Sequence, residues 1–335
     1  MWRRFGLVTL FENYGGILLA LILLILVFTS FASETPGKGI SHPLALLPSS
    51  AEFVVSLDTF ALRKSDLVAE MEKRFDSIPE AAENYRRFVQ ETGVDPRQDT
   101  DRVLISLRQV DAGFDSGFLI VAEGRFGSSR LVDTAAEKGG TIVTTEDGTR
   151  LWTSRGQNGE GGTVRALAQP GPDMILFGHE SEVRRALDIL ARRAAPEVKS
   201  SKLKDLIAGV DRRAPAWAIL NSSALASKLS QEIGRSGADW DPGAAISKVD
   251  SVTVMGWVGK DVDVKLRVST RDGETASLLA DVVRGALAAG KLAAKDRDAE
   301  LLKILQQTSL VQEGTSLEME ASIPASRFQL PTGAE

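Results

Sequence analysis

The feature that most constrains this chain is an uncharged apolar run near its start. Residues 15–32 carry no charge. A helix of about 18 residues is about 27 Å long, which matches the hydrocarbon thickness of a bilayer. Arg3 and Arg4 precede the run, and Glu12 is the only acid before it, so the positive-inside tendency keeps the N-terminus in the cytoplasm. The sequence therefore predicts a single-pass transmembrane helix over residues 15–32, with the bulk of the chain extracytoplasmic.

The same run could serve as a signal peptide. Ser30 and Ala32 are small residues at the −3 and −1 positions of a cleavage site that follows Ala32. Against cleavage, the apolar core is rich in Leu and Ile and long for a secretory signal. An uncleaved anchor is the favoured interpretation, and secretion after cleavage following Ala32 stays the alternative.

Composition excludes several kinds of site. The chain has 335 residues, 43% of them apolar, which is enough for about two domains with cores of their own. It contains no Cys, so it has no disulfide or thiolate metal site, and two histidines (His42 and His179) are too few for a His-rich metal site. A net charge of −5 argues against a protein that coats nucleic acid. We therefore expect no cofactor, no metal site and no nucleic-acid partner.

The exported part alternates short β-rich runs with amphipathic helical runs. Asp58, directly after the apolar run 53–57, is a good N-cap for a helix. Ser77 and Glu80 flank Pro79 like a capping box that restarts a helix, and Gly93 begins a stop signal. The predicted strands of this half are 53–57, 102–108, 117–123, 141–145, 149–153, 164–168 and 174–177, and its later helices are 128–138 and 180–193.

The second half of the exported part repeats this pattern. Residues 51–62 align with residues 214–225, so that Asp58 matches Asn221. Further matches are 94–96 with 240–242, 101–105 with 250–254, the strands 117–123 with 262–269, the helices 128–138 with 274–292, and the hairpins 141–153 with 309–322. The pattern favours a duplicated unit, and the alternative is two unrelated α+β domains that share common cap and turn residues.

These patterns predict an α+β fold in which a transmembrane helix precedes two related repeats. Each repeat would form an antiparallel sheet with its helices packed on one face. The predicted divisions are 1–33 (cytoplasmic stub and transmembrane helix or signal peptide), 34–46 (linker), 47–193 (first α+β repeat), 194–213 (basic connecting segment), 214–330 (second α+β repeat) and 331–335 (tail).

Four patterns resemble ligand-binding or catalytic motifs, and each has a structural interpretation that we favour. Gly285 to Lys291 has P-loop spacing, but Leu292 replaces the Ser or Thr that would hold magnesium, and a helical pattern precedes it. The Gly-rich run 156–162 reads as a hairpin loop, and His179 as a helix-start residue. The acids Asp95, Asp99, Asp101, Asp261 and Asp263 read as solvated side chains or turn caps.

One charge asymmetry is a candidate surface. Residues 184–213 hold nine basic and four acidic residues, a net charge of +5 within an acidic chain. Such a segment could meet anionic lipid headgroups or an acidic envelope protein, although the interspersed acids also fit a solvated helix face. The basic residues are Arg184, Arg185, Arg192, Arg193, Lys199, Lys202, Lys204, Arg212 and Arg213.

Short motifs give the exported region a resemblance to other chains. Leu47-Pro48 leads into the strand that ends before Asp58, and Gly93-Val-Asp-Pro96 forms a turn before the next strand. With the N-terminal anchor, this arrangement resembles uncharacterised single-pass envelope proteins of bacteria that carry a duplicated α+β extracytoplasmic region. The resemblance implies topology and location and brings no catalytic residues.

The sequence therefore favours a membrane-anchored, extracytoplasmic, non-enzymatic protein that scaffolds or binds partners in the cell envelope. Its partners would be the bilayer, through residues 15–32, and envelope proteins or anionic headgroups. One alternative is a ligand-binding module with a groove for a lipid, peptide or glycan between the two repeats. A third hypothesis is a hydrolase with two carboxylates about 5–9 Å apart in a cleft.

Overall fold

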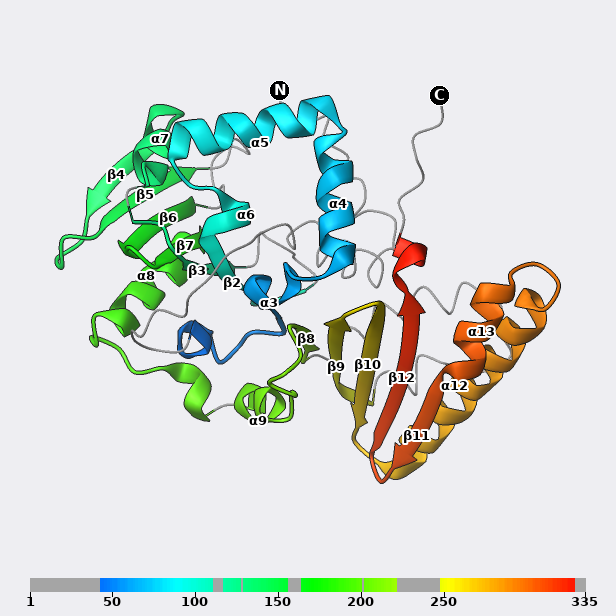
Figure 1. Cartoon of the computed structure of the whole chain (residues 1–335). Helices are drawn as coiled ribbons and strands as arrows, with labels where there is room; N and C mark the ends of the chain where they lie inside the picture. The colour runs from blue at the N-terminus through cyan, green and yellow to red at the C-terminus, as the bar shows by residue number, and fades with distance from the viewer. Residues whose placement is uncertain are drawn as a thin grey trace.

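The strands of the chain form one antiparallel sheet rather than two. The computed structural model describes residues 43–110, 117–127, 129–155, 164–200, 202–221 and 248–328. Within them the sheet has 12 strands in the order β11-β12-β10-β9-β8-β1-β2-β3-β7-β6-β5-β4 (Figure 1). The strands are β1 (Phe53–Leu57), β2 (Thr100–Leu107), β3 (Phe118–Gly124), β4 (Thr141–Thr144), β5 (Arg150–Arg155), β6 (Val164–Gly171), β7 (Met174–His179), β8 (Ala216–Leu220), β9 (Val249–Val258), β10 (Asp261–Thr270), β11 (Ser309–Glu313) and β12 (Ser316–Pro324).

The predicted α+β class is confirmed, and the prediction of two separate sheets is wrong. The two halves join because β1 pairs with β8. Val55 stands opposite Ala218 at the middle of this pair, with Phe53 opposite Leu220 at one end. Backbone hydrogen bonds therefore run across the boundary between the halves.

Helices cover both faces of the sheet, so the prediction of helices on a single face is also wrong. In Figure 1, α4 and α5 lie above the sheet, and α8 and α9 lie below it. The helices are η2 (Pro43–Leu46), α3 (Thr59–Leu62), α4 (Asp66–Asp76), α5 (Pro79–Thr92), α6 (Pro96–Asp99), α7 (Leu131–Glu137), α8 (Glu180–Leu190), η4 (Glu197–Ser200), α9 (Lys202–Ala208), α12 (Gly273–Ala294), α13 (Ala299–Gln307) and η5 (Ala325–Phe328).

The central strands explain the two covered faces. Val54 and Val55 are consecutive and both fully buried, so β1 is apolar on both sides. Val54 belongs to a cluster with residues of α8 and α9, whereas Val55 packs with Leu62 and Val68 of α3 and α4. A continuous apolar run in a short strand is typical of a strand buried on both faces.

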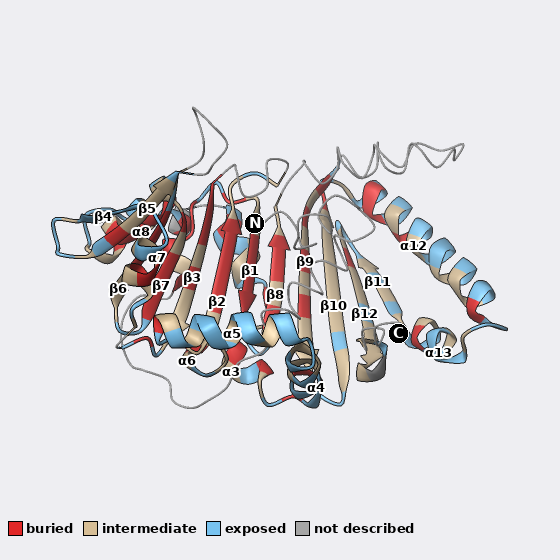
Figure 2. Ribbon diagram, turned by 90° about the horizontal axis from the view of Figure 1, so that it is seen from above, coloured by how far each residue is buried: buried red, intermediate tan, exposed pale blue. Residues whose placement is uncertain are grey.

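The outer strands of the second half differ, because their faces alternate. In β10, Val264, Leu266 and Val268 point to the face that carries α12, and Lys265 and Arg267 point to the opposite face. Figure 2 shows the change from red central strands to tan outer strands. This alternation is what a half-buried antiparallel strand requires.

The cap and stop residues in the sequence predicted several helix ends correctly. Asp58 is the N-cap of α3 and accepts a hydrogen bond from the Ala61 amide at 2.8 Å. Gly93 ends α5 with φ = +70°, as the stop signal predicted. The capping box at Pro79 is wrong: α5 begins there without a side-chain cap, and Ser77 instead ends α4 by donating to the Arg74 carbonyl. The short helix α13 was not predicted.

The predicted correspondence between the two halves holds for β1, β2 and β3 with β8, β9 and β10, and it fails for the final hairpin. The hairpin beside β10 is β11–β12, and the hairpin beside β3 is β6–β7, not the predicted match β4–β5. Chain order alone therefore matched the wrong hairpins. The domain boundaries and the duplication itself stay predictions.

Several sequence predictions fall outside the described residues. These are the apolar span 15–32 with its cleavage site after Ala32, the linker up to His42, the Gly-rich loop 156–162, and the segment from 222 to 247 that contains the second Asp-Pro turn. In the described part of the chain, no helix has the length and apolarity to cross a bilayer.

Candidate functional site

A polar surface with two hollows lies over β10, β12 and β11, on the face opposite α12. Two adjoining hollows there have volumes of about 480 and 810 Å³. The end of α9 and the residues after it form one wall, and the strands form the floor. We call this surface the charged trough and define it by Asp211, Arg213, Lys265, Arg267, Glu318 and Glu320.

The floor of the charged trough is a ladder of ion pairs between neighbouring strands. Lys265 Nζ lies 2.6 Å from Glu318 Oε2 and 3.1 Å from Glu320 Oε1. Arg267 donates from Nε to Glu318 Oε1 at 2.7 Å. Cross-strand pairs of opposite charge stabilise an antiparallel sheet. The charges of the floor are therefore largely paired within the chain.

These contacts shift the pKa values of Glu318 and Lys265. Hydrogen bonds from Lys265 and Arg267 hold the pKa of Glu318 below its ordinary value of 4.5. The hydrogen bond to Glu318 raises the pKa of Lys265 above its ordinary value. Both groups stay ionised at neutral pH, so Glu318 is poorly suited to donate a proton as a general acid.

The wall of the trough comes from the basic connecting segment. Leu203 of α9 is buried in the same cluster as Met255 of β9, which holds the helix against the sheet. Beyond the helix, Arg267 Nη1 donates to the Gly209 carbonyl at 3.2 Å. Arg213 is 87% exposed at its side chain and pairs with Asp211 at 2.8 Å. Residues 205–213 of the basic connecting segment thus border the trough.

The trough ends at an open edge of the sheet. In the described part of the chain, β11 is the last strand and pairs only with β12. Val311 at its middle is 51% exposed and lines one hollow together with Glu313. Ser309 lines the other hollow. A free edge presents backbone N–H and C=O groups that can pair with another chain.

The predicted basic surface is not a uniform patch of unpaired charge. Arg184 pairs with Glu180 at 2.7 Å, Arg193 with Asp188 at 2.9 Å, and Lys202 with Asp250 at 3.7 Å. Arg192, Lys204 and Arg212 are exposed, and the side chain of Lys199 lies outside the described residues. Several of the basic residues are therefore paired with nearby acids, and the segment keeps its net charge of +5.

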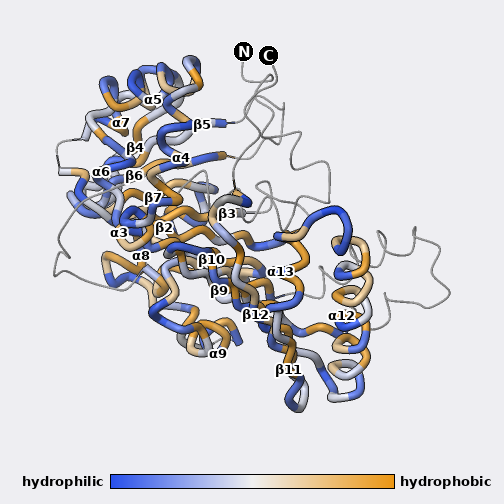
Figure 3. Tube along the Cα trace, turned by 45° about the vertical axis from the view of Figure 1, so that its right-hand side comes forward, coloured by the Kyte–Doolittle hydropathy of each residue, from blue (hydrophilic) through white to orange (hydrophobic). Residues whose placement is uncertain are grey.

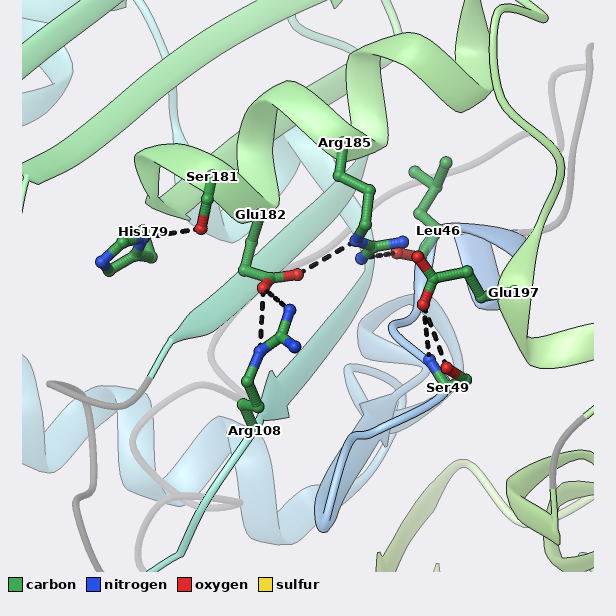
Figure 4. Close-up of polar contacts among 8 residues, drawn as sticks. All are labelled: Leu46, Ser49, Arg108, His179, Ser181, Glu182, Arg185 and Glu197. Atoms are coloured by element: carbon green, nitrogen blue, oxygen red, sulfur yellow. Dashed lines mark hydrogen bonds and ion pairs between the residues drawn. The ribbon is translucent and has the colours of Figure 1, made fainter.

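Arg185 has a structural role that the sequence did not reveal. Glu182 is 2% exposed and accepts hydrogen bonds from Arg108 on one side and from Arg185 Nε at 3.1 Å on the other (Figure 4). Arg185 also donates to the Leu46 carbonyl at 2.6 Å. Beside it, Glu197 accepts from the Ser49 amide at 3.2 Å and from its hydroxyl at 3.1 Å. The cluster fastens the chain that leads into β1 to α8 and η4.

The acids at residues 95–101 act as caps and ion-pair partners. Asp95 caps α6 by accepting from the Arg97 amide, and Asp99 accepts from the Asp95 amide at 2.7 Å. Asp101 lies 3.7 Å from Arg63 and 3.8 Å from Arg125. No group of His, Cys, Asp or Glu within the described ranges has the arrangement of a metal site.

A second charged cluster lies near the start of α3. Burial lowers the pKa of Arg63 to about 10 and raises the pKa values of Asp101 and Glu123 above their ordinary values. Arg102 binds Glu123 at 3.4 Å. Raised carboxyl pKa values also occur in active sites, but none of these three residues lines either hollow.

The remaining candidate motifs lie on helices and strands of the fold. The P-loop-like run 285–291 lies within α12, as its helical pattern indicated. His179 is the N-cap of α8, and its Nδ1 lies 2.9 Å from the Ser181 hydroxyl (Figure 4). Asp263 is exposed and lines one hollow of the trough, and Asp261 is half-buried.

A scan with models of protein families and searches of curated proteins and of solved structures found no match to this chain. Its function is therefore inferred from its residues and their geometry alone.

Proposed function

We propose that this chain is a membrane-anchored, extracytoplasmic, non-enzymatic protein of the bacterial cell envelope that scaffolds or binds a partner protein. The anchor is the apolar span 15–32, and the partner is an extended segment of another envelope protein. The single observation that supports partner binding is the free strand β11 at the border of the charged trough.

The mode of binding is the addition of a strand to the sheet. The outer backbone groups of β11 would pair with the extended segment, which supplies affinity without regard to sequence. Alternate side chains of that segment would point into the hollows over Val311 and Glu313. The paired charges of the floor would favour a segment that carries both signs, since such a segment can exchange ion pairs with Lys265 and Glu318.

The position of β11 beside the charged trough supports this choice of sheet edge. Natural proteins protect free edges with bulges, Pro, Lys or very short strands. The two edge strands of the described sheet, β4 with 4 residues and β11 with 5, both lack Pro and Lys and pair in an unbroken register. Of these two strands, β11 lines the hollows of the trough.

The two other hypotheses have weaker support. A ligand groove between the halves has little room at the strand joint, because β1 and β8 pair directly and Val55 and Ile219 are fully buried. A carboxylate-based hydrolase could use Glu318 and Glu320, whose Cα atoms are about 7 Å apart because they lie two residues apart on one strand. Lys265 binds both carboxylates, and its hydrogen bond lowers the pKa of Glu318, which makes Glu318 a poor proton donor.

The test is site-specific crosslinking in the cells that make the protein. A photo-reactive residue at position 311 should form a discrete crosslinked product with another envelope protein, and Val311→Lys should lower the yield of a crosslink from position 309. The matched control is Val143, a comparably exposed residue on the other edge strand. Equal crosslinking from positions 143 and 311, or none from either, would contradict the proposal.

The anchor is tested separately. The mass of the mature protein distinguishes an intact N-terminus from cleavage after Ala32, and carbonate extraction of membranes distinguishes an integral from a peripheral protein. We expect the intact mass and retention in the membrane. A soluble, intact protein would contradict the anchor without bearing on β11.

A further inference from the structure

The helix α12 is apolar yet largely uncovered. Its buried residues are Thr275, Ala276 and Ala280 near the start and Ala294 at the end. Between them, from residue 281 to residue 293, the charged residues are Asp281, Arg284 and Lys291, and the rest are Val, Leu, Ala and Gly. Figure 2 shows α12 slanting away from the sheet, and Figure 3 marks apolar segments along most of its length. A helix of this composition is normally buried.

The uncovered residues follow a regular spacing. Leu278, Val282, Gly285, Ala289 and Leu292 are spaced by four, three, four and three, and all five are exposed. We call them the α12 stripe. Leu278 is 53% exposed and Leu292 is 76% exposed. A Cβ atom built on Gly285 would meet no other atom within 4 Å. Such a repeat is the seam by which one helix packs against another in a coiled coil.

The charges that flank the stripe indicate what packs on it. Glu274 lies beside the stripe near the start of α12, and Lys295 lies on the same side at its end. Both are exposed, and neither forms an ion pair with another described residue. In an antiparallel pair of α12 helices, these two positions face each other twice, once at each end. The flanking charges are thus complementary to those of a second copy.

The sizes of the side chains in the stripe match in the same register. In the antiparallel register in which Leu278 faces Ala289 of a second copy, Val282 faces Gly285, and Glu274 lies within two residues of the level of Lys295 at the flank of the pair. Leu278 and Val282 therefore each meet a small residue, which lets the helix backbones approach closely. We propose that α12 is a self-association surface, through which two copies of this chain form an antiparallel, two-fold symmetric dimer.

A lipid surface fits the stripe less well than a second copy does. Helices that lie in a membrane interface carry bulky Trp, Phe or Leu on the apolar face and Lys or Arg on the other. The centre of the stripe is Gly285 and Ala289, α12 has no aromatic residue, and Asp281 flanks the apolar side. A short single-helix contact is smaller than a standard protein interface, so we expect a weak dimer that dissociates on dilution.

The first test measures the self-association of the full chain in mild detergent by analytical ultracentrifugation. We expect a dimer fraction that rises with concentration. Val282→Glu should weaken the dimer by at least about tenfold, because it places a charge in the seam. Ser277→Glu, at an exposed position of α12 outside the stripe, is the matched control and should leave association unchanged. Circular dichroism establishes that each variant is folded.

The second test fixes the register. The chain contains no Cys, so single cysteines can be introduced without background. A mixture of Leu278→Cys and Ala289→Cys chains should form a disulfide-linked dimer, whereas each variant alone should not. A charge swap adds a further check: Glu274→Lys should weaken the dimer, and Glu274→Lys with Lys295→Glu should restore it.

Two results would overturn the proposal. One is a monomer at every concentration tested. If Val282→Glu then lowers binding of that monomer to vesicles of anionic lipid, the stripe is a lipid-binding face. The other is a dimer that Val282→Glu leaves intact and that gives no crosslink between positions 278 and 289.

Discussion

Val55 of β1 lies directly opposite Ala218 of β8, at the centre of the strand pair that joins the two halves of the sheet. The registers on either side match. Phe53 pairs with Leu107 in the first half, and Ala216 pairs with Gly256 in the second. Phe53 is aligned with Ala216 and Leu107 with Gly256 in the two segments, so equivalent positions of the two halves form equivalent strand pairs.

This joint predicts that the halves unfold together. Val55 is fully buried, so Val55→Ala should lower the free energy of unfolding by about 2 kcal/mol. Because backbone hydrogen bonds cross the joint, urea denaturation followed by tryptophan fluorescence and by circular dichroism should give one coincident transition. Val143→Ala on the exposed edge strand should change stability by less than about 0.5 kcal/mol. Two separate transitions would contradict the prediction.

The buried carboxylate of Glu182 predicts that its removal greatly lowers the free energy of unfolding. Glu182→Ala leaves Arg185, which is 15% exposed at its side chain, without its anionic partner. Removing one member of a buried ion pair costs about 3–5 kcal/mol. Glu180→Ala, which removes only the exposed pair with Arg184, should cost less than about 1 kcal/mol. Equal losses for the two variants, measured by urea denaturation, would show that the cluster contributes no special stability.

The pKa of Glu318 predicts a pH-dependent contribution to stability. Its pKa is held below the ordinary 4.5 by the hydrogen bond from Lys265, so the folded state favours the ionised form. That contribution is fully present above pH 4.5 and is lost as the pH falls through the lower folded pKa. Glu318→Gln should therefore destabilise the protein at pH 7 and have a smaller effect at the acid end. Denaturation at several pH values measures this, with Glu313→Gln as control. A loss that is the same at every pH would contradict it.

The left-handed conformation of Gly93 at the end of α5 predicts that substitutions there lower the stability of the protein by amounts that depend on the new residue. With φ = +70°, any L-residue other than Asn or Asp is strained there. Gly93→Ala should lower the free energy of unfolding by about 1 kcal/mol, and Gly93→Asn should cost about half as much. Thermal or urea denaturation compares the two variants. An alanine variant as stable as the parent chain would show that the cap can relax.

The predictions that succeeded depend on neighbouring residues. The strand at Phe53–Leu57, the cap at Asp58 and the stop at Gly93 each follow from side chains within a few positions of one another. The capping box failed because α5 starts one residue later than it requires: Ile78 is the N-cap and Pro79 the first helical residue, so Ser77 is instead the C-cap of α4. The sequence of α12 likewise indicated a helix correctly but not what would lie against it.

Sequence alone determined the α+β class, the alternation of charged and apolar residues along β10, and several helix ends, because backbone preference and side-chain period act locally. Tertiary structure decided that one sheet forms instead of two, that helices cover both faces, and that Glu182 meets Arg108 from 74 positions away. It also decided that the basic segment borders the charged trough and that the α12 stripe stays exposed. Such pairings depend on which distant surfaces bury each other, and no local pattern encodes that choice.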